Sequence, residues 1–476
     1  MWNPFVPQEQ RHSFARGGWF FSEVIPNRLA VFSLNTLYFF DSNSAVDGCD
    51  PKSEPGYEHM EWLRIQLQFL RERGMKAILI GHVPPARTES KQSWDESCYQ
   101  KYTLWLRQYR DVIVGSVFGH MNLDHFMFQD VKDLAYKFVI DGIDDEFTRP
   151  GRPAQSSNDD LFTTAAKVTY LNELREDWSS LPQPPDGSSY PTAVDGSDPP
   201  IDGESKKQTE LKKFLAEIGG PWAERYSLSL VSPSVVPNFY PTLRIIEYNI
   251  TGLEDEHPAT KAIGVPADVR RNEQQNGWGL QDWDTDHLSD PSDSQRDIQD
   301  NIHELKKKKK KGKKGKKKLP KPKFPVPEPP AKTTPPGPAY SPQTLSLISW
   351  TQYYANLTKI NDDFRKGPDV MKKKHPAHFT YDVEYTTNDG IYQMKDLTMR
   401  SWLDLAERIG RKELKASDDS IPWQGMDIGM APPSVPTHIK DTTTKTKQPK
   451  NHVWRAFVKR AYVHTKPEEE LEDSFG

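Results

Sequence analysis

The stretch YEHMEWLRIQLQFLRERGMKAILIGHVPP, Tyr57 to Pro85, decides the fold class. Four apolar side chains in it recur at the spacing of one helical face, namely Met60, Leu63, Leu67 and Leu70. Gly74 then follows, in the position of a residue that ends a helix. The next apolar run, KAILI, is short enough for a buried strand, and it leads directly into Gly81-His82. The stretch therefore predicts a helix, a strand and a polar turn in close succession.

The residues that follow repeat this order. YQKYTLWLRQYR predicts a second helix, and the apolar run DVIVGSVF predicts another strand that leads into Gly119-His120. On the other side, WFFSEVI and LAVFSLNTLYF predict two strands separated by a turn at Pro26-Asn27. Strands that alternate with helices indicate an α/β sheet with functional loops at the strand ends.

The two Gly-His turns predict a metal site. Loops at the ends of parallel strands converge on one edge of a sheet, so His82 and His120 are expected to face a common place. Neutral imidazole is a common metal ligand, and Asn122 offers an amide oxygen close by. The glycine before each histidine would allow close backbone approach and an unusual φ. A histidine alone after a strand is more often an ordinary polar residue.

Composition indicates that much of the chain lies outside a core. The 476 residues include 40 prolines, only 35% are hydrophobic, and the mean hydropathy is −0.78. We predict five regions: the main part of an α/β domain at 1–150, a polar and largely disordered insertion with one or two short helices at 151–221, a β-rich segment completing the domain at 222–253, a disordered linker at 254–342, and a helical and β-containing region at 343–476.

Charge is segregated along the chain. The net charge is −4, from 63 basic and 67 acidic residues. The chain therefore has no overall positive charge that would indicate binding to a nucleic acid, and no specific nucleic-acid partner is expected. The linker contains an acidic block and then eleven lysines within the thirteen residues Lys306 to Lys318. This run is either a solvated tether or an arm that binds polyanions.

The sequence contains no apolar run of the roughly 18 to 20 residues that span a bilayer, and no signal peptide is visible. Cys49 and Cys98 are the only cysteines. They would remain separate thiols in a cytosolic protein and would pair in a lumenal one. Asn249-Ile-Thr251 and Asn356-Leu-Thr358 have the sequence of N-glycosylation sites.

Several motifs resemble one enzyme family. IGHVPP, followed about forty residues later by FGHMNLDHF, resembles the C-terminal half of a calcineurin-like metallophosphoesterase. The resemblance is narrower to the acid sphingomyelinase-like branch, and within it to the fungal vacuolar endopolyphosphatases. SLVSPSVVPNFYPTLR, YYANLTKINDDF and MKDLTMRSWLDLAERIG carry the same resemblance. It covers most of 8–150, 222–250 and 345–465, and it implies an α/β, metallophosphoesterase-type β-sandwich flanked by helices.

The resemblance implies a site that binds two divalent metal ions. His82 and His120 match metal-binding histidines of the family. Asn122 stands where the family usually has a second histidine, and its oxygen would favour Mg²⁺, Mn²⁺ or Co²⁺ over Zn²⁺. Asp124 and His125 are either supporting partners of the ligands, with His125 also able to meet a phosphate, or exposed polar residues of the turn. Arg87 is either a phosphate contact or an ordinary surface arginine.

The family's N-terminal motifs, Asp-x-His, Gly-Asp-x-x-x-x-Asp and Gly-Asn-Asn/His-Asp, are absent from this sequence. We therefore expect the chain to begin inside the domain, without its N-terminal βαβ part, its membrane anchor and about half of the ligands. The implied reaction is hydrolysis of internal phosphoanhydride bonds in inorganic polyphosphate in the vacuole, with Cys49 and Cys98 forming a disulfide. The alternatives are a phosphodiesterase of the acid sphingomyelinase type and a non-catalytic remnant that binds polyanions.

Overall fold

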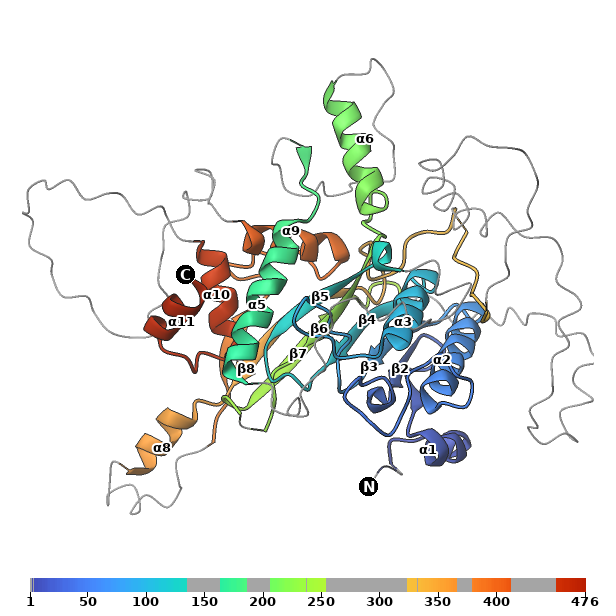
Figure 1. Cartoon of the computed structure of the whole chain (residues 1–476), viewed down its shortest axis with the longest axis horizontal. Coiled ribbons are helices and arrows are strands. Elements are labelled where there is room, and N and C mark those ends of the chain that lie inside the picture. The colour runs from blue at the N-terminus through green and yellow to red at the C-terminus, as the bar shows by residue number, and fades with distance from the viewer. Residues whose placement is uncertain are drawn as a thin grey trace, which may run out of the picture.

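A computed structural model describes residues 2, 4–134, 163–185, 206–236, 238–253, 323–331, 333–365, 379–411 and 451–476. These residues form a mixed α/β fold with two sheets flanked by helices, as the sequence predicts. In Figure 1, helices α2 and α3 lie on one side of the strands, and helices α5, α9, α10 and α11 lie on the other.

The first sheet has six strands in the order β1-β2-β3-β4-β6-β5. The strands are β1 (Phe20–Ile25), β2 (Leu29–Ser33), β3 (Lys76–Ile80), β4 (Ile113–Phe118), β5 (His125–Asp130) and β6 (Tyr226–Val231). Neighbouring strands from β2 through β3 and β4 to β6 are parallel, whereas β1 and β5 are antiparallel to their neighbours. The carboxyl ends of the four parallel strands therefore meet at one edge of the sheet, which positions the loops that follow them.

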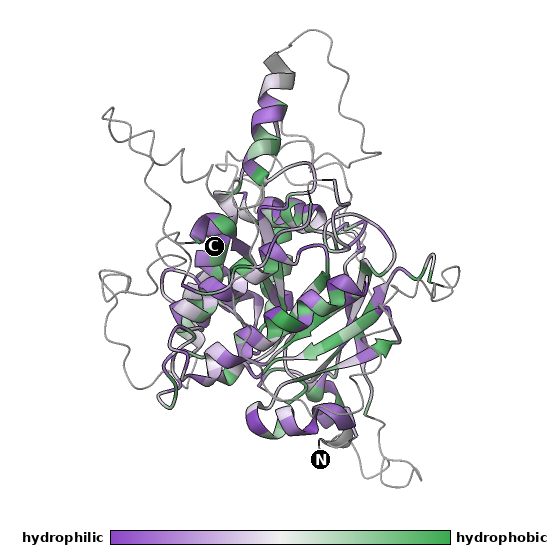
Figure 2. Cartoon of the chain, turned by 90° about the vertical axis from the view of Figure 1, so that its right-hand side faces the viewer, coloured by the Kyte–Doolittle hydropathy of each residue, from purple (hydrophilic) through white to green (hydrophobic). Residues whose placement is uncertain are grey.

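Two helices cover one face of this sheet. They are α2 (Pro55–Glu72) and α3 (Glu96–Gln108). The four apolar residues that predicted the first helix are all buried, and Gly74 adopts a left-handed φ of 67° just beyond its end. Figure 2 shows the strands in mostly hydrophobic colours and the helices with mixed ones, which is the pattern of half-buried helices.

The second sheet has three antiparallel strands in the order β7-β8-β9. They are β7 (Thr242–Tyr248), β8 (Leu347–Tyr354) and β9 (Asp382–Thr386). Strands β7 and β8, which are far apart in the sequence, are thus direct neighbours in this sheet. The segment predicted at 222–253 is divided, since β6 completes the first sheet and β7 begins the second.

The remaining elements are short or lie at the periphery of the sheets. The helices are α1 (Arg11–Gly17), α5 (Thr164–Ser179), α6 (Lys206–Ile218), α8 (Leu357–Arg365), α9 (Met399–Gly410), α10 (His452–Ala461) and α11 (Glu468–Phe475). The described residues also contain 3-10 turns at Gln8–Gln10 (η1), Thr36–Tyr38 (η2) and Val131–Asp133 (η3). The predicted strand LAVFSLNTLYF is therefore shorter than expected, because the chain turns at η2.

Helix α5 shows that the predicted polar insertion contributes to the core. It packs against α9, and its buried side chains are Lys167, Tyr170, Leu171, Leu174 and Trp178. The ring of Trp178 stacks on Phe126 of β5 at 4.5 Å between centroids. An apolar side chain of this size stabilises the fold by roughly 1.5–3 kcal/mol when fully buried. The sequence predicts one or two short helices in this region, but its polar composition gave no sign that one of them is part of the core.

The end of the predicted linker also packs against the domain. Phe324 is buried beside Trp105, and Arg71 of α2 donates a hydrogen bond of 2.9 Å to the carbonyl of Glu328. Tyr340 is buried as well. The acidic block and Lys306 to Lys318 lie outside the described residues. Among the described helices, none is both long and apolar enough to cross a bilayer.

Candidate metal site at the sheet edge

The edge formed by the carboxyl ends of β3, β4 and β6 brings the two Gly-His turns together. The N–H of Gly119 donates to the carbonyl of His82 at 3.0 Å, so the hydrogen bonding of the strands continues into the turns. On the far side of β4, the N–H of Ser232 donates to the carbonyl of Phe118 at 2.9 Å. The turns thus continue the backbone hydrogen bonding of the sheet.

The imidazoles of His82 and His120 face each other at this edge. Nε2 of His82 lies 3.3 Å from Nδ1 of His120, and the rings meet edge to face with centroids 5.1 Å apart. His82 is exposed and His120 is half-buried. Phe40 contacts the ring of His120 edge-on, with centroids 5.3 Å apart. Two nitrogens therefore converge where a small ligand can reach them.

The backbone of the second turn is unusual at two residues that are not glycine. His120 has a φ of 67° and Asn122 has a φ of 55°, both in the left-handed region. This region is uncommon for residues with a side chain, although Asn and His are enriched in it. The prediction that the glycines would carry the unusual φ is wrong, because the positive values fall on the residues that follow Gly119.

Gly81 supplies close approach instead. A Cβ on Gly81 would lie 2.5 Å from Cγ2 of Thr36 and 3.0 Å from the ring of Phe118, so no larger residue fits without displacement. At Gly119 the same atom would lie 3.8 Å from Nδ1 of His82, an ordinary contact. The first turn thus needs its glycine for packing, and the second does not.

Thr36 is a supporting residue that the sequence reading missed. Its Oγ1 accepts hydrogen bonds from the N–H groups of His82 at 3.1 Å and of Val83 at 2.8 Å. Thr36 follows β2, the neighbour of β3, and is buried. A hydroxyl residue just after a parallel strand was the available signal, since it had to end at the same edge as His82.

Arg87 is engaged within the protein. Its guanidinium pairs with Glu96 at 3.0 Å and lies 4.6 Å from the centre of the Tyr99 ring. The charge that the sequence offered to a phosphate is therefore already balanced by a carboxylate. The structure therefore shows Arg87 in an ion pair and not as a free surface arginine, and its role as a phosphate contact stays a prediction.

Asp124 and His125 are buried, which excludes the interpretation as exposed turn residues. Both ring nitrogens of His125 have partners, with Nδ1 3.1 Å from the carbonyl of Leu123 and Nε2 3.0 Å from the hydroxyl of Tyr170. Burial lowers the pKa of His125 to about 4, so its imidazole is neutral at ordinary pH. His125 is therefore not available to a phosphate. The Asp124 carboxylate forms an ion pair with Arg244 at 2.6 Å.

The pair of imidazoles fits two ligands of one metal ion. Metal–imidazole bonds of about 2.0–2.1 Å place two ligand nitrogens of one ion about 2.8–3.4 Å apart, for angles from 90° to tetrahedral. The separation of 3.3 Å lies in this range. Within the described ranges, however, no group of three or more His, Cys, Asp or Glu side chains is placed to hold a metal. Any further ligand would be Asn122 or a group outside those ranges.

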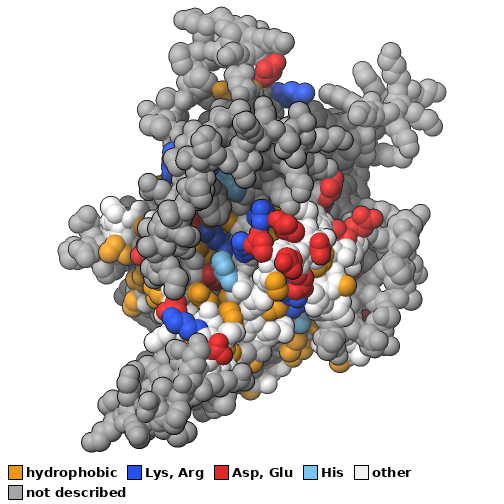
Figure 3. Space-filling view, turned by 90° about the vertical axis from the view of Figure 1, so that its left-hand side faces the viewer, with side chains coloured by type: hydrophobic (Ala, Val, Ile, Leu, Met, Phe, Trp, Pro, Cys, Tyr) orange, Lys and Arg blue, Asp and Glu red, His pale blue; other side chains and the backbone are white. Residues whose placement is uncertain are grey.

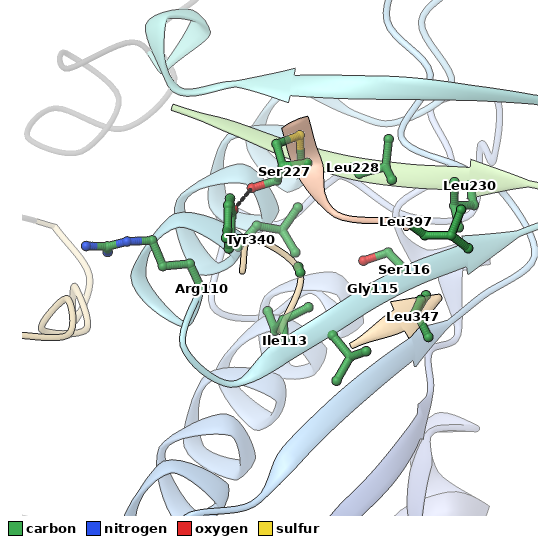
Figure 4. A pocket seen from close by; sticks show the side chains of 14 residues that line it. Arg110, Ile113, Gly115, Ser116, Ser227, Leu228, Leu230, Tyr340, Leu347 and Leu397 are labelled. Atoms are coloured by element: carbon green, nitrogen blue, oxygen red, sulfur yellow. Dashed lines mark hydrogen bonds between the residues drawn. The ribbon is translucent and has the colours of Figure 1, made fainter. Parts of the chain in front are cut away.

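A small cavity of about 30 Å³ lies elsewhere in the fold. Figure 4 shows that β4, β6 and the segment around Tyr340 line it, with the hydroxyls of Tyr340 and Ser227 3.4 Å apart. It has space for roughly two water molecules. This cavity is too small for a substrate and is separate from the histidine pair.

The face of the molecule that carries α10 and α11 is rich in carboxylates. Figure 3 shows red side chains gathered beside a few blue ones. Lys459 pairs with Glu468 at 2.5 Å, and Arg455 pairs with the same carboxylate and with Glu472 at 3.3 Å. The described part of this face offers no excess of positive charge to a polyanion.

Comparison with known proteins identifies the family of this chain. No family model matches the chain. The endopolyphosphatase of Neurospora crassa is 46% identical over 88% of this chain and 59% of its own length. That of Yarrowia lipolytica is 32% identical over 98% and 66%, and that of Saccharomyces cerevisiae is 34% identical over 90% and 63%. The chain belongs to the fungal endopolyphosphatase family. It spans about three fifths of the length of these curated relatives.

The disulfide of this endopolyphosphatase-family chain supports the same region of the sheet. Cys49 and Cys98 are bonded, with Cα atoms 4.9 Å apart, and both are fully buried. The bond ties the segment before α2 to the first turn of α3, which follows the His82 loop. Lys101 donates to the carbonyl of Cys49 at 2.6 Å. The loop that carries His82 is thus fixed at the sheet and again at α3.

Proposed function

We propose that this chain supplies part of the active site of an endopolyphosphatase, a hydrolase that cleaves internal phosphoanhydride bonds of inorganic polyphosphate. The observation that carries the proposal is the facing pair of His82 and His120, on a chain whose relatives bear the name endopolyphosphatase. Polyphosphate is the substrate that this name indicates.

His82 and His120 would hold a divalent metal ion, with Asn122 as a further donor. When bound, such ions polarise phosphoryl oxygens and lower the pKa of a bound water. The protein's own contribution is to orient the ligands: Thr36 fixes the backbone of the first turn, and Phe40 limits rotation of the His120 ring. An amide oxygen from Asn122 would favour Mg²⁺, Mn²⁺ or Co²⁺, with Zn²⁺ as the alternative.

The described residues supply two imidazoles, which is too few for two metal ions. We therefore expect the 476-residue chain to leave long-chain polyphosphate intact in the presence of Mn²⁺ or Co²⁺. A chain extended by the part of the Neurospora crassa relative that this sequence does not match is expected to shorten it. Polyacrylamide gels of the products measure both outcomes. Metal-dependent cleavage that survives replacement of both histidines by alanine would contradict the proposal.

We further propose a vacuolar location. A buried disulfide is typical of an oxidising compartment. The sequon residues Asn249 and Asn356 lie directly after β7 and directly before α8, at element ends that are partly accessible. We propose both as glycosylation sites, and a membrane anchor as a feature of the longer family members.

The lysine run from Lys306 to Lys318 is proposed as an arm for polyanions, because clustered lysines release counterions from a linear polyphosphate. Its deletion should weaken polyphosphate binding and flatten the dependence of log K on log[salt], while cleavage of short substrates by the extended chain should hardly change. Fluorescence titrations at several salt concentrations measure the slope. A slope unaffected by the deletion would return the segment to the role of a tether.

A further inference from the structure

The turn that carries His120 is held by a buried group of polar side chains. Both strained residues, His120 and Asn122, precede Asp124, whose carboxylate is 95% buried. Left-handed backbone at residues other than glycine costs about 1–3 kcal/mol each, and it persists only where the surroundings impose it. The contacts of Asp124 are therefore candidates for the interactions that impose this left-handed backbone.

Asp124 is fixed from three directions. Its Oδ1 pairs with Nη2 of Arg244 at 2.6 Å, and its Oδ2 accepts a hydrogen bond of 2.5 Å from the hydroxyl of Tyr385. Its backbone N–H donates to the carbonyl of Ala461 at 3.1 Å. Arg244 belongs to β7, Tyr385 to β9 and Ala461 to α10. The metal-site turn on the first sheet is thus anchored to the second sheet and to a C-terminal helix.

Arg244 is itself held by side chains besides Asp124. Its Nε donates to Oε1 of Gln352 at 2.7 Å, and its guanidinium lies 4.0 Å from the centre of the Trp350 ring. Both of these partners come from β8. The side chain of Arg244 is 5% exposed, as is that of Asp124. The guanidinium is therefore held in one place, and its fork presents a fixed donor to Asp124.

A buried ion pair of this kind contributes little net stability compared with well-packed apolar residues. Its value lies in specifying one geometry. Here the geometry specified is that of the turn whose other end places Nδ1 of His120 at 3.3 Å from Nε2 of His82. Met121 and Leu123, between the polar residues, are buried and anchor the same turn by packing.

We propose that Arg244 is a positioning residue for the metal site, acting through Asp124 to hold His120 opposite His82. This inference rests on the proposed function, since it assumes that the histidine pair binds a metal. It assigns a role in the site to a strand that lies 120 residues further along the chain. The second sheet thereby becomes part of the device that aligns the metal ligands.

The test is a titration of the 476-residue chain with Co²⁺, in which calorimetry and the visible absorption of the bound ion both report binding. Arg244→Met should weaken Co²⁺ binding by about 10- to 100-fold, the usual effect of losing a partner that orients a ligand. Arg244→Lys keeps the charge but loses the fork, and it should give an intermediate affinity. The matched control is Arg110→Met, which breaks the half-buried pair of Arg110 with Glu224 at 2.9 Å and should leave Co²⁺ affinity unchanged.

Two further measurements separate the possible failures. If Arg244→Met does not fold, Asp124→Asn and Tyr385→Phe remove single contacts of the same group and should also weaken binding. The ¹⁵N resonances of the His120 ring in the metal-free chain should shift in these variants and not in Arg110→Met. Wild-type affinity and unshifted His120 resonances in folded variants would overturn the positioning role. Wild-type Co²⁺ binding that is unaffected by His82→Ala would instead overturn the proposed metal site.

Discussion

Replacement of His120 by alanine is expected to remove divalent metal binding from the sheet edge. The ring supplies one of two nitrogens that lie 3.3 Å apart, and the described residues place no third His, Cys, Asp or Glu to take over. Loss of a direct ligand should exceed the roughly 10- to 100-fold effect of losing a supporting partner. His82→Ala should have the same consequence, because the pair acts as a unit.

Calorimetric titration with Co²⁺ and Mn²⁺ measures this effect without relying on turnover. The matched control is His12→Ala, since His12 is exposed on α1 and lies outside the sheet edge. Asn122→Ala should cost less than either histidine, because water can replace an oxygen donor. In the extended chain, both histidine variants should also abolish polyphosphate cleavage. Unchanged metal affinity in the two histidine variants would remove the basis of the site.

Removal of the disulfide is expected to cause the largest loss of stability. Cys49 and Cys98 are separated by 49 residues. In the chain-entropy description, closing a loop of this length stabilises the folded state by about 4 kcal/mol. The double variant Cys49→Ser/Cys98→Ser should therefore unfold at a clearly lower urea concentration than the wild type.

Urea unfolding followed by tryptophan fluorescence measures the difference. Dithiothreitol should lower the midpoint of the wild type and leave that of the double variant unchanged, which isolates the bond from other effects of the substitutions. Mass spectrometry of alkylated, non-reduced protein from its native compartment checks the bond itself. Two freely alkylated cysteines in that sample would refute it.

The sequence was sufficient for the elements with strong local patterns. The periodicity of α2, the short run of β3 and the repeated Gly-His turns each depend on neighbouring residues, so they could be predicted from a single stretch. The convergence of His82 and His120 followed from one general rule about parallel strands. The structure confirms these elements and brings the two histidines together.

The parts that could not be predicted depend on partners far along the chain. Arg244 and Tyr385 meet Asp124 across 120 and 261 residues, and nothing local marks them as a group. A helix was expected in the region of α5, but its burial against the core was not, because the overall composition of that segment is polar. Arg87 follows the first Gly-His turn, and nothing in the local sequence marks its ion pair with Glu96 at the start of α3.

The pairing of β7 with β8 has a consequence for how the molecule holds together. These strands pair from Thr242↔Tyr354 to Tyr248↔Leu347, with one register shift between Glu247 and Tyr248, although 98 residues separate the end of one from the start of the other. A protease that cuts between Leu253 and Lys323 would therefore leave two polypeptides joined by a shared sheet. One piece would carry both histidines and Arg244, and the other would carry Tyr385 and α10. The histidine site would then belong to a non-covalent complex of two fragments, in which neither piece alone contains the full support of the His120 turn.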